Sequence, residues 1–353
     1  MTWQRYKLSL DYIGSAFYGV VRQPAQHHGG GKRSRPVATP TVEASLRETL
    51  NKFVGATNHK DLCFSSRTDR GVHAMGNSLH VDLRRKKKKK RRCSRDEESF
   101  HGAHHSPETV RSALNALALQ KGQQWRVADA EAVGSDFHAR FCAESRDYMY
   151  RIIFPSPESC KGWPRGKRQP GMFERDRAWL VNCPLDVNLM GEAAGLLVGT
   201  HDFSSFRGSG CQMSSPVRTI DLVDIKHGCG ELMTQDKGAM VVQVNVRASG
   251  YLYRMVRNIV SGETVAQPLS SLFISVQIIL SPPNQSPFCY TVLVAAGSHK
   301  MKVADVQSLL EARDRRKGPA PAPAHGLYLT GVNYSTYSLR ERMKEMGYTE
   351  RVE

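Results

Sequence analysis

Asp69 is the residue of this chain whose surroundings are best suited to chemistry. It lies in a short segment, residues 65–74 (SSRTDRGVHA), in which Arg67 and Arg70 flank its carboxylate. A nearby positive charge lowers the pKa of a carboxylate, so Arg67 is a candidate for keeping Asp69 ionised. An ionised carboxylate can act as a nucleophile or as a base. The alternative is that Asp69 and Gly71 are present only because aspartate and glycine favour turns.

The sequence around this segment predicts that it connects two strands. After it, apolar Leu79, Val81 and Leu83 alternate with polar residues, which is the period-two pattern of a half-buried strand. A short, partly apolar run precedes it at residues 61–65. We therefore expect Asp69 to lie on a loop between strands, where its carboxylate is presented without being buried.

Four further blocks follow along the chain: residues 136–151 (DFHARF and SRDYMYR), residues 199–219, residues 251–259 (YLYRMVRNI) and residues 322–329 (APAHGLYL). With the Asp69 segment, their order and approximate spacing resemble the TruA family of tRNA pseudouridine synthases. The resemblance covers most of residues 5–334. Each block alone is weak, but five in order are specific.

The resemblance implies a role for several residues. Asp69 would be the nucleophile, Tyr148 would pack against Asp69 and the target base, and Arg257 would pair with the nucleophile. Assistance of the final deprotonation is a second role open to Tyr148. Leu327 would line the base pocket. Arg67, His138 and Arg140 are candidates for holding the RNA; for the last two, a surface or satisfied core position is the open alternative.

The reaction that the resemblance implies is the isomerisation of uridine to pseudouridine in tRNA. Asp69 would act as a nucleophile or would start an elimination through a glycal, and the sequence leaves both open. A base inside a stem is shielded, so the target nucleotide must be extracted. Isomerisation exchanges bonds without net redox or group transfer, so we expect no cofactor and no metal.

The basic composition of the chain fits binding to a polyanion such as a nucleic acid. The net charge is +17; residues 84–95 carry ten of the basic residues, and the remainder of the chain still carries +7. Basic charge outside the tract fits a surface that follows phosphates. The eight cysteines are scattered without a Cys-x-x-Cys pair, which argues against a zinc site and fits a reducing compartment.

The sequence also bears on location and assembly. It predicts neither a secretory signal nor a membrane segment, because a strand pattern begins near residue 5 and the longest apolar run is short and interrupted. Mitochondrion, nucleus and cytosol all remain open. The resemblance implies a homodimer, as in bacterial members.

The predicted fold is α+β: the pseudouridine synthase fold, with a mixed, mainly antiparallel sheet flanked by helices around a central catalytic cleft. We expect helices capped by Thr41, Ser106 and Asp186. Alternating residues at 148–154 and 242–246 indicate strands. Residues 199–207 are expected to form a loop that bears polar groups. We divide the chain into residues 1–105, with the Asp69 loop, and residues 106–353, which would complete the cleft.

Three segments depart from the family pattern. Residues 26–40 lengthen the connection between the first strand and the first helix and are expected to be a surface loop, with contact to RNA as the open alternative. The basic tract at 84–95 fits either a nuclear address or an arm for the tRNA backbone. Residues 261–290 interrupt an expected helix, and we interpret them as a retained intron or gene-model error, which sequencing of the mature transcript would test.

Two other functions compete with catalysis. A catalytically inactive RNA-binding relative is supported by the insert and by Arg70 and Val20, which stand where the family usually has alanine and tryptophan. Intact Asp69, Tyr148 and Arg257 count against it. The other competing function, a polybasic adaptor in the nucleus or at a membrane surface, would depend on residues 84–95 alone.

Overall fold

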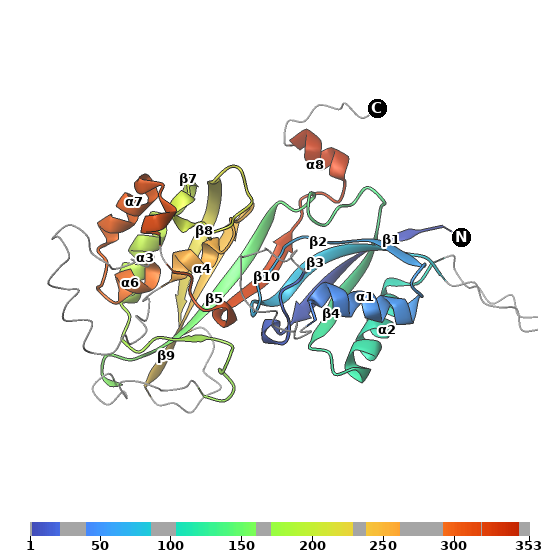
Figure 1. Cartoon of the computed structure of the whole chain (residues 1–353), viewed down its shortest axis with the longest axis horizontal. Helices are drawn as coiled ribbons and strands as arrows, with labels where there is room; N and C mark the ends of the chain where they lie inside the picture. Colours follow the sequence, from blue (N-terminus) through green and yellow to red (C-terminus); the bar gives the residue numbers. More distant parts are fainter. Residues whose placement is uncertain are drawn as a thin grey trace, which may run out of the picture. The chain divides into compact units, whose positions relative to one another are not determined.

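The computed structural model describes residues 2–21, 40–85, 104–159, 171–228, 238–261, 292–318 and 320–345. It divides into two compact units (Figure 1). The first unit contains Met1–Tyr148 and Tyr328–Glu353, and the second contains Met149–Leu327. Our division of the sequence at residue 105 stays a prediction. The loop at 26–40, the basic tract and the insert lie outside the described residues, except for Pro40, Arg84, Arg85 and Ser261.

The sheet of the first unit is built around strand β3. On one side of β3 (His73–Leu83) lies the antiparallel strand β1 (Gln4–Tyr12), which in turn pairs with β4 (Trp125–Val133). On its other side, β3 pairs antiparallel with β2 (His59–Phe64) and, near its beginning, parallel with β10 (Leu327–Asn333). The start of β3, which directly follows the Asp69 segment, is therefore held by a strand on each side.

Alternation in the sequence explains these strands. Tyr6, Leu8, Leu10 and Tyr12 of β1 are buried, while the residues between them are partly exposed. Each fully buried leucine contributes roughly 1.5–3 kcal/mol to stability. The pattern therefore determines which face of β1 is turned to the core.

Two helices of the first unit begin at the residues predicted to cap them. Helix α1 (Val42–Phe53) starts after Thr41, whose side chain accepts a hydrogen bond from the Ala44 N–H. Helix α2 (Pro107–Gln120) starts after Ser106, whose side chain accepts from the Thr109 N–H. The two helices lie side by side, and α2 packs on β4 (Figure 1). The remaining elements of this unit are the 3-10 helix η1 (Gly14–Ala16) and helix α8 (Leu339–Glu345).

The strands of the second unit follow one another in the order β5-β9-β8-β7. These strands are β5 (Ser145–Pro155), which begins in the first unit, β7 (Gly199–Asp202), β8 (Val217–His227) and β9 (Ala239–Ala248); the short strand β6 (Trp179–Leu180) pairs parallel with β5. Burial alternates as predicted over residues 148–152 of β5 and 242–248 of β9, but Ile153 of β5 is buried as well. The expected loop at 199–207 is wrong in its first part, because Gly199–Asp202 pairs antiparallel with residues 217–220.

The helices of the second unit are α3 (Val187–Gly195), α4 (Met255–Val260), α6 (Leu293–Gly297) and α7 (Val303–Ala312), with 3-10 helices η3 (Ser204–Phe206), η4 (Arg315–Lys317) and η5 (Ala324–Gly326). Asp186 caps α3 as predicted, with its carboxylate accepting from the N–H groups of Asn188 and Leu189. Helix α4 ends at Val260, directly before the predicted insert.

The predicted fold class is confirmed. Helices accompany a mixed, mainly antiparallel sheet, as expected of an α+β pseudouridine synthase fold. The central catalytic cleft stays a prediction. Among the described residues, no helix is both long enough and apolar enough to cross a membrane.

Candidate active site

Asp69 lies on the loop between β2 and β3, as predicted from the sequence. The loop begins with Ser65, whose N–H donates to the carbonyl of Ser78 at 2.8 Å. It closes with a turn in which the Val72 N–H donates to the Asp69 carbonyl at 3.1 Å. Gly71 within this turn has a φ of 83°, a conformation that favours glycine. The Asp69 side chain is half-buried.

A second loop, at residues 14–20, holds the Asp69 loop from the side. The Val20 N–H donates to the Thr68 carbonyl at 3.3 Å. A Cβ atom on Gly19 would lie 2.9 Å from the same oxygen, and one on Gly14 would lie 1.9 Å from the Val72 carbonyl oxygen. The two backbones approach so closely that only glycine fits at these positions. Asp69 is thus presented by a loop whose backbone is fixed at both ends.

Buried polar side chains hold the Asp69 loop in place through hydrogen bonds. The hydroxyl of Tyr12 lies 2.9 Å from the Thr68 hydroxyl, and the Asn77 amide donates to the Tyr12 hydroxyl at 3.1 Å and to the Ser66 carbonyl at 3.2 Å. Burial raises the pKa of Tyr12, so its phenol stays protonated.

Tyr148 belongs to the same unit as Asp69 and is influenced by its charge. It lies on β5 and is buried. Burial raises its pKa well above the usual value for tyrosine, and the nearby Tyr12 and the carboxylate of Asp69 raise it further. The structure therefore brings together two of the three predicted catalytic residues, and it keeps the phenol of Tyr148 neutral.

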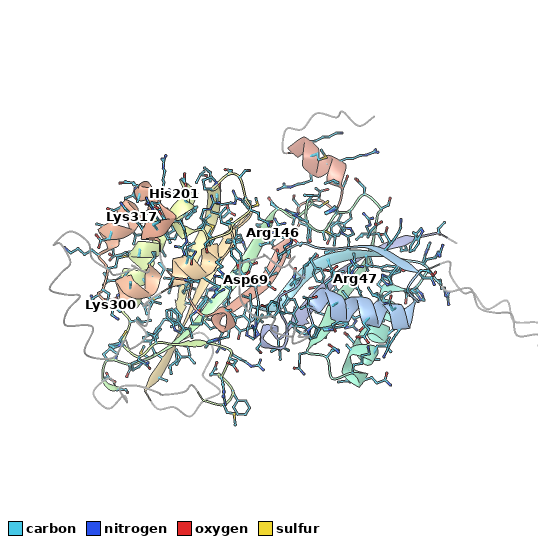
Figure 2. The ribbon with its side chains drawn as sticks, in the orientation of Figure 1. Arg47, Asp69, Arg146, His201, Lys300 and Lys317 are labelled. Atoms are coloured by element: carbon cyan, nitrogen blue, oxygen red, sulfur yellow. The ribbon has the colours of Figure 1, made fainter. Side chains whose placement is uncertain are left out.

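Arg146 is a cation of this site that sequence reasoning did not select. Its positive charge acts on Tyr148, and its guanidinium donates to the carbonyls of Arg140 at 2.8 Å and Ala143 at 3.3 Å. Figure 2 labels Arg146 and Asp69 within the first unit. The signal was available in the sequence, because residues 146 and 148 point to the same face of a strand.

The three predicted RNA-binding residues of this unit have different environments. Arg67 and Arg140 are exposed, whereas His138 is half-buried. The Nδ1 atom of His138 accepts from the N–H groups of Arg140 and Phe141, each at 3.2 Å. The His138 ring stacks on that of Phe141, with centroids 4.4 Å apart, and the Arg140 guanidinium lies 5.4 Å from the Phe141 ring. His138 thus fixes a turn whose outer surface is aromatic and basic.

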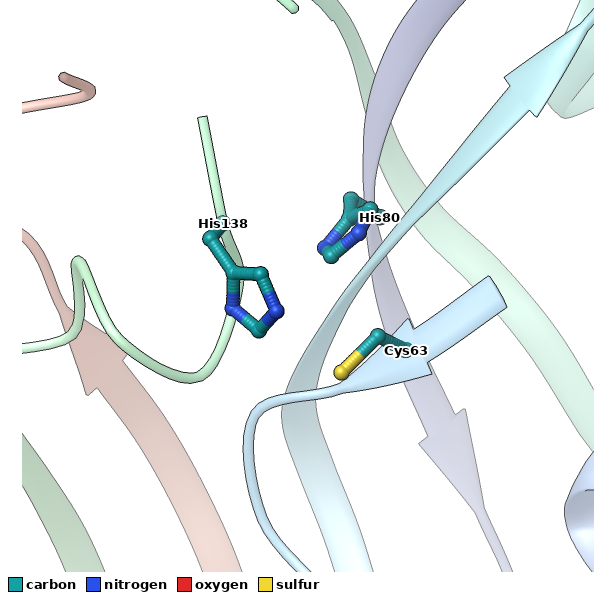
Figure 3. Close-up of side chains that lie close together, drawn as sticks. All are labelled: Cys63, His80 and His138. Atoms are coloured by element: carbon teal, nitrogen blue, oxygen red, sulfur yellow. The ribbon is translucent and has the colours of Figure 1, made fainter. Parts of the chain in front are cut away.

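His138 also belongs to a cluster with Cys63 and His80, whose potential metal-binding atoms lie within 4.8 Å of one another (Figure 3). Cys63 and His80 are directly opposite each other on β2 and β3. Burial lowers the pKa of His80 to about 4, helped by the positive charge of Arg5, and burial also lowers the pKa of His138. Both rings are therefore neutral at pH 7.

Hydrogen bonding in this cluster disfavours a metal ion. A histidine that binds a metal generally donates its second ring N–H to an acceptor. Here the Nδ1 atoms accept instead, that of His80 from the Ala139 N–H at 3.0 Å and that of His138 as described. Each neutral ring then carries its proton on Nε2, where a metal would have to displace it. The expected absence of a metal site stays a prediction.

Arg257 and Leu327 lie in the second unit. Arg257 is half-buried on α4, and its Nε donates to the Ala322 carbonyl at 2.6 Å. Leu327 is buried and begins β10. The pairing of Arg257 with Asp69 and the contact of Leu327 with the base stay predictions.

Comparison with known proteins identifies the family. A family model described as tRNA pseudouridine synthase matches residues 193–267. The tRNA pseudouridine synthase A of Paramagnetospirillum magneticum is 32% identical over 333 residues, which cover 94% of this chain and 95% of that protein. The protein of the same name from Agrobacterium fabrum is 31% identical over 346 residues, 98% of each chain. With this identity over nearly its full length, the chain belongs to the tRNA pseudouridine synthase A family.

Proposed function

We propose that this chain isomerises uridine to pseudouridine in tRNA, with Asp69 as the nucleophile. The relatives that it matches over nearly its whole length are named for activity on tRNA. The observation that carries the assignment is the position of Asp69 on a loop fixed by Gly14, Gly19 and Thr68, with the buried Tyr148 in the same unit.

The reaction is a balanced exchange of bonds within one nucleotide. The bond between N1 of uracil and C1′ of ribose breaks, the base turns, and C5 bonds to C1′. The C5 proton leaves, and N1 gains a proton. A carboxylate can add to the nucleotide and later leave, or it can take a proton to begin an elimination.

The neutral phenol of Tyr148 suits it for stacking on the extracted base. Because its pKa is raised by burial and by the charge of Asp69, it holds its proton at neutral pH. A protonated phenol cannot accept the C5 proton. We therefore assign Tyr148 to positioning the base beside Asp69 and leave the acceptance of the proton to Asp69 or solvent.

The remaining assignments follow from the family resemblance. Arg257 would keep Asp69 ionised, and Leu327 would line the base pocket. Arg67 and Arg140, both exposed, would contact the RNA, while His138 would hold the turn that carries Arg140. A contact of Arg67 or Arg140 with phosphate would contribute to binding in a salt-dependent way.

Release of tritium from tRNA labelled at uracil C5 tests the proposal. The parent protein should release tritium, and Asp69→Asn should release at least about a thousandfold less, because the nucleophile is gone. Asp129→Asn is the matched control: it makes the same chemical change at an exposed position of β4 and should retain activity.

Two outcomes would contradict the proposal. Equal release by the parent and by Asp69→Asn would remove Asp69 from the mechanism. Binding of tRNA by the parent without any release would favour the inactive RNA-binding relative. Deletion of residues 84–95 distinguishes a synthase from a polybasic adaptor. An adaptor would lose its binding, whereas a synthase would keep detectable isomerisation.

We further propose that the protein is a homodimer, as the resemblance to bacterial members implies. Light scattering during size-exclusion chromatography would measure the mass in solution. A mass near 39.4 kDa at micromolar concentration would contradict a stable dimer.

A further inference from the structure

Arg70 occupies an unusual position, directly after the proposed nucleophile and on the outside of its loop. Its side chain is exposed, and its guanidinium carbon lies 4.9 Å from the centroid of the Tyr18 ring. The Tyr18 side chain is itself 57% exposed. A large aromatic ring and a cation are thus displayed together beside the proposed site of chemistry.

The backbone that carries Tyr18 is fixed. The Tyr18 N–H donates to the Pro40 carbonyl at 3.1 Å, and the Gly19 carbonyl accepts from the Val42 N–H at 3.2 Å, at the start of α1. A Cβ on Gly19 would lie 3.5 Å from the Arg70 nitrogen. The loop of Tyr18 and the loop of Arg70 therefore form one packed unit, and the position of the stack does not depend on the two side chains alone.

The charge of Arg70 is not neutralised by the parts of the protein that are described. Within these ranges, no carboxylate forms an ion pair with Arg70, whereas the half-buried Arg47 pairs with Glu43 and the exposed Arg126 pairs with Asp11. Stacking on an aromatic face uses the flat side of a guanidinium and leaves its N–H edge available. That edge matches the oxygens of a phosphate, to which it can donate two parallel hydrogen bonds.

Arg70 is close enough to Asp69 to contact a phosphate that flanks the target nucleotide. Adjacent Cα atoms are about 3.8 Å apart, so Arg70 begins one residue from Asp69. A nucleotide whose C1′ atom meets Asp69 must bring its own backbone phosphates within reach of the same loop. Arg67, the other exposed arginine of the loop, lies before Asp69 rather than after it.

We propose that Arg70, held on Tyr18, is a clamp for a backbone phosphate of the RNA next to the nucleotide being isomerised. This inference rests on the proposed function, because it takes tRNA as the ligand. It assigns to Arg70 a contribution to RNA binding made by the guanidinium that stacks on Tyr18.

Binding of an unmodified tRNA transcript over a series of KCl concentrations tests the clamp. Loss of one phosphate contact lowers the slope of log K against log salt by roughly 0.7–0.9. Arg70→Ala should lower the slope by this amount and weaken binding roughly tenfold at low salt. Arg126→Ala removes the same charge at a surface position of β4 and should change the affinity less than twofold.

Three further variants distinguish the contribution of the Arg70–Tyr18 stack to binding from that of the positive charge of Arg70. Arg70→Lys should keep most of the salt slope but lose part of the affinity, because lysine keeps the charge without the planar fork. Tyr18→Phe should bind like the parent, since the ring face remains, whereas Tyr18→Ala should weaken binding several-fold. Thermal unfolding of each variant would identify a loss caused by misfolding, and Arg70→Lys and Tyr18→Phe keep the inference testable in that case.

The outcomes distinguish this inference from the proposed function. An Arg70→Ala protein with the salt slope and affinity of Arg126→Ala overturns the clamp, even if the parent releases tritium from labelled tRNA. A lowered slope in Arg70→Ala supports the clamp even if the parent proves catalytically inactive. A parent that does not bind tRNA overturns both.

Discussion

The buried imidazole of His80 predicts that the protein loses stability below pH 6.5. Burial, together with the positive charge of Arg5 and the neighbouring His138, lowers the pKa of His80 to about 4, although Asp61 opposes this change. In the unfolded chain the pKa is about 6.5. The unfolded state therefore binds a proton in a range of pH where the folded state does not.

The sign and the size follow from proton linkage. As the pH falls from 6.5 towards 4, the unfolded state gains a proton at this position and the free energy of unfolding decreases. The difference between 6.5 and about 4, at 1.36 kcal/mol for each pKa unit, corresponds to roughly 3 kcal/mol. About 2 kcal/mol of this should be lost by pH 5, and below pH 4 the contribution of His80 should level off.

Urea unfolding of the parent and of His80→Asn between pH 7 and pH 4 measures this effect. Asparagine can offer an acceptor to the Ala139 N–H, as Nδ1 of His80 does, but it does not titrate. The variant should be less stable than the parent at pH 7. Between pH 6.5 and pH 5, the free energy of unfolding of the variant should fall by about 2 kcal/mol less than that of the parent. His227→Asn changes an exposed histidine and serves as the control.

Parallel pH curves for the parent and for His80→Asn would refute the reasoning. So would an NMR titration in which the His80 ring protonates near pH 6.5 in the folded protein. Either result would mean that the site is more open to water than its 3% exposure indicates.

Three further predictions concern the loop, a helix end and the proposed base platform. Gly14→Ala places a Cβ against the Val72 carbonyl oxygen, so it should destabilise the protein by a few kcal/mol and reduce tritium release, whereas Gly134→Ala, which meets nothing within 4 Å, should do neither. Ser106→Ala removes the cap of α2 and should cost about 1 kcal/mol in urea unfolding; an unchanged midpoint would contradict the capping role. Tyr148→Phe keeps the ring and should retain more tritium release than Tyr148→Leu, whereas an equal loss in both variants would mean that the hydroxyl, rather than the ring, is required.

Local features of the fold were predictable from the sequence. The caps at Thr41, Ser106 and Asp186 were correct because a capping side chain bonds to N–H groups only two or three residues away. Residues 199–202 were predicted wrongly as part of a loop. Their strand depends on pairing with residues 217–220, a partner that the local sequence does not specify.

For the site, the sequence by itself determined the identity of the acid and the kind of loop that carries it. An aspartate between arginines, followed by glycine and flanked by alternating residues, is a local pattern, and the ordered blocks supply the family. Tyr148 and Arg257 were likewise selected from their blocks. Arg146 was not selected, although its spacing from Tyr148 places both on one face of β5.

Only the tertiary structure decided which groups share an environment. Tyr18 and Arg70 are separated by more than fifty residues of sequence, and Cys63, His80 and His138 come from three separate segments. The neutral state of Tyr148 depends on burial and on the charge of Asp69, which belong to the folded chain. Spacing along a chain predicts contacts within one helix or strand, but contacts between segments and the dielectric around a group arise only when the core closes.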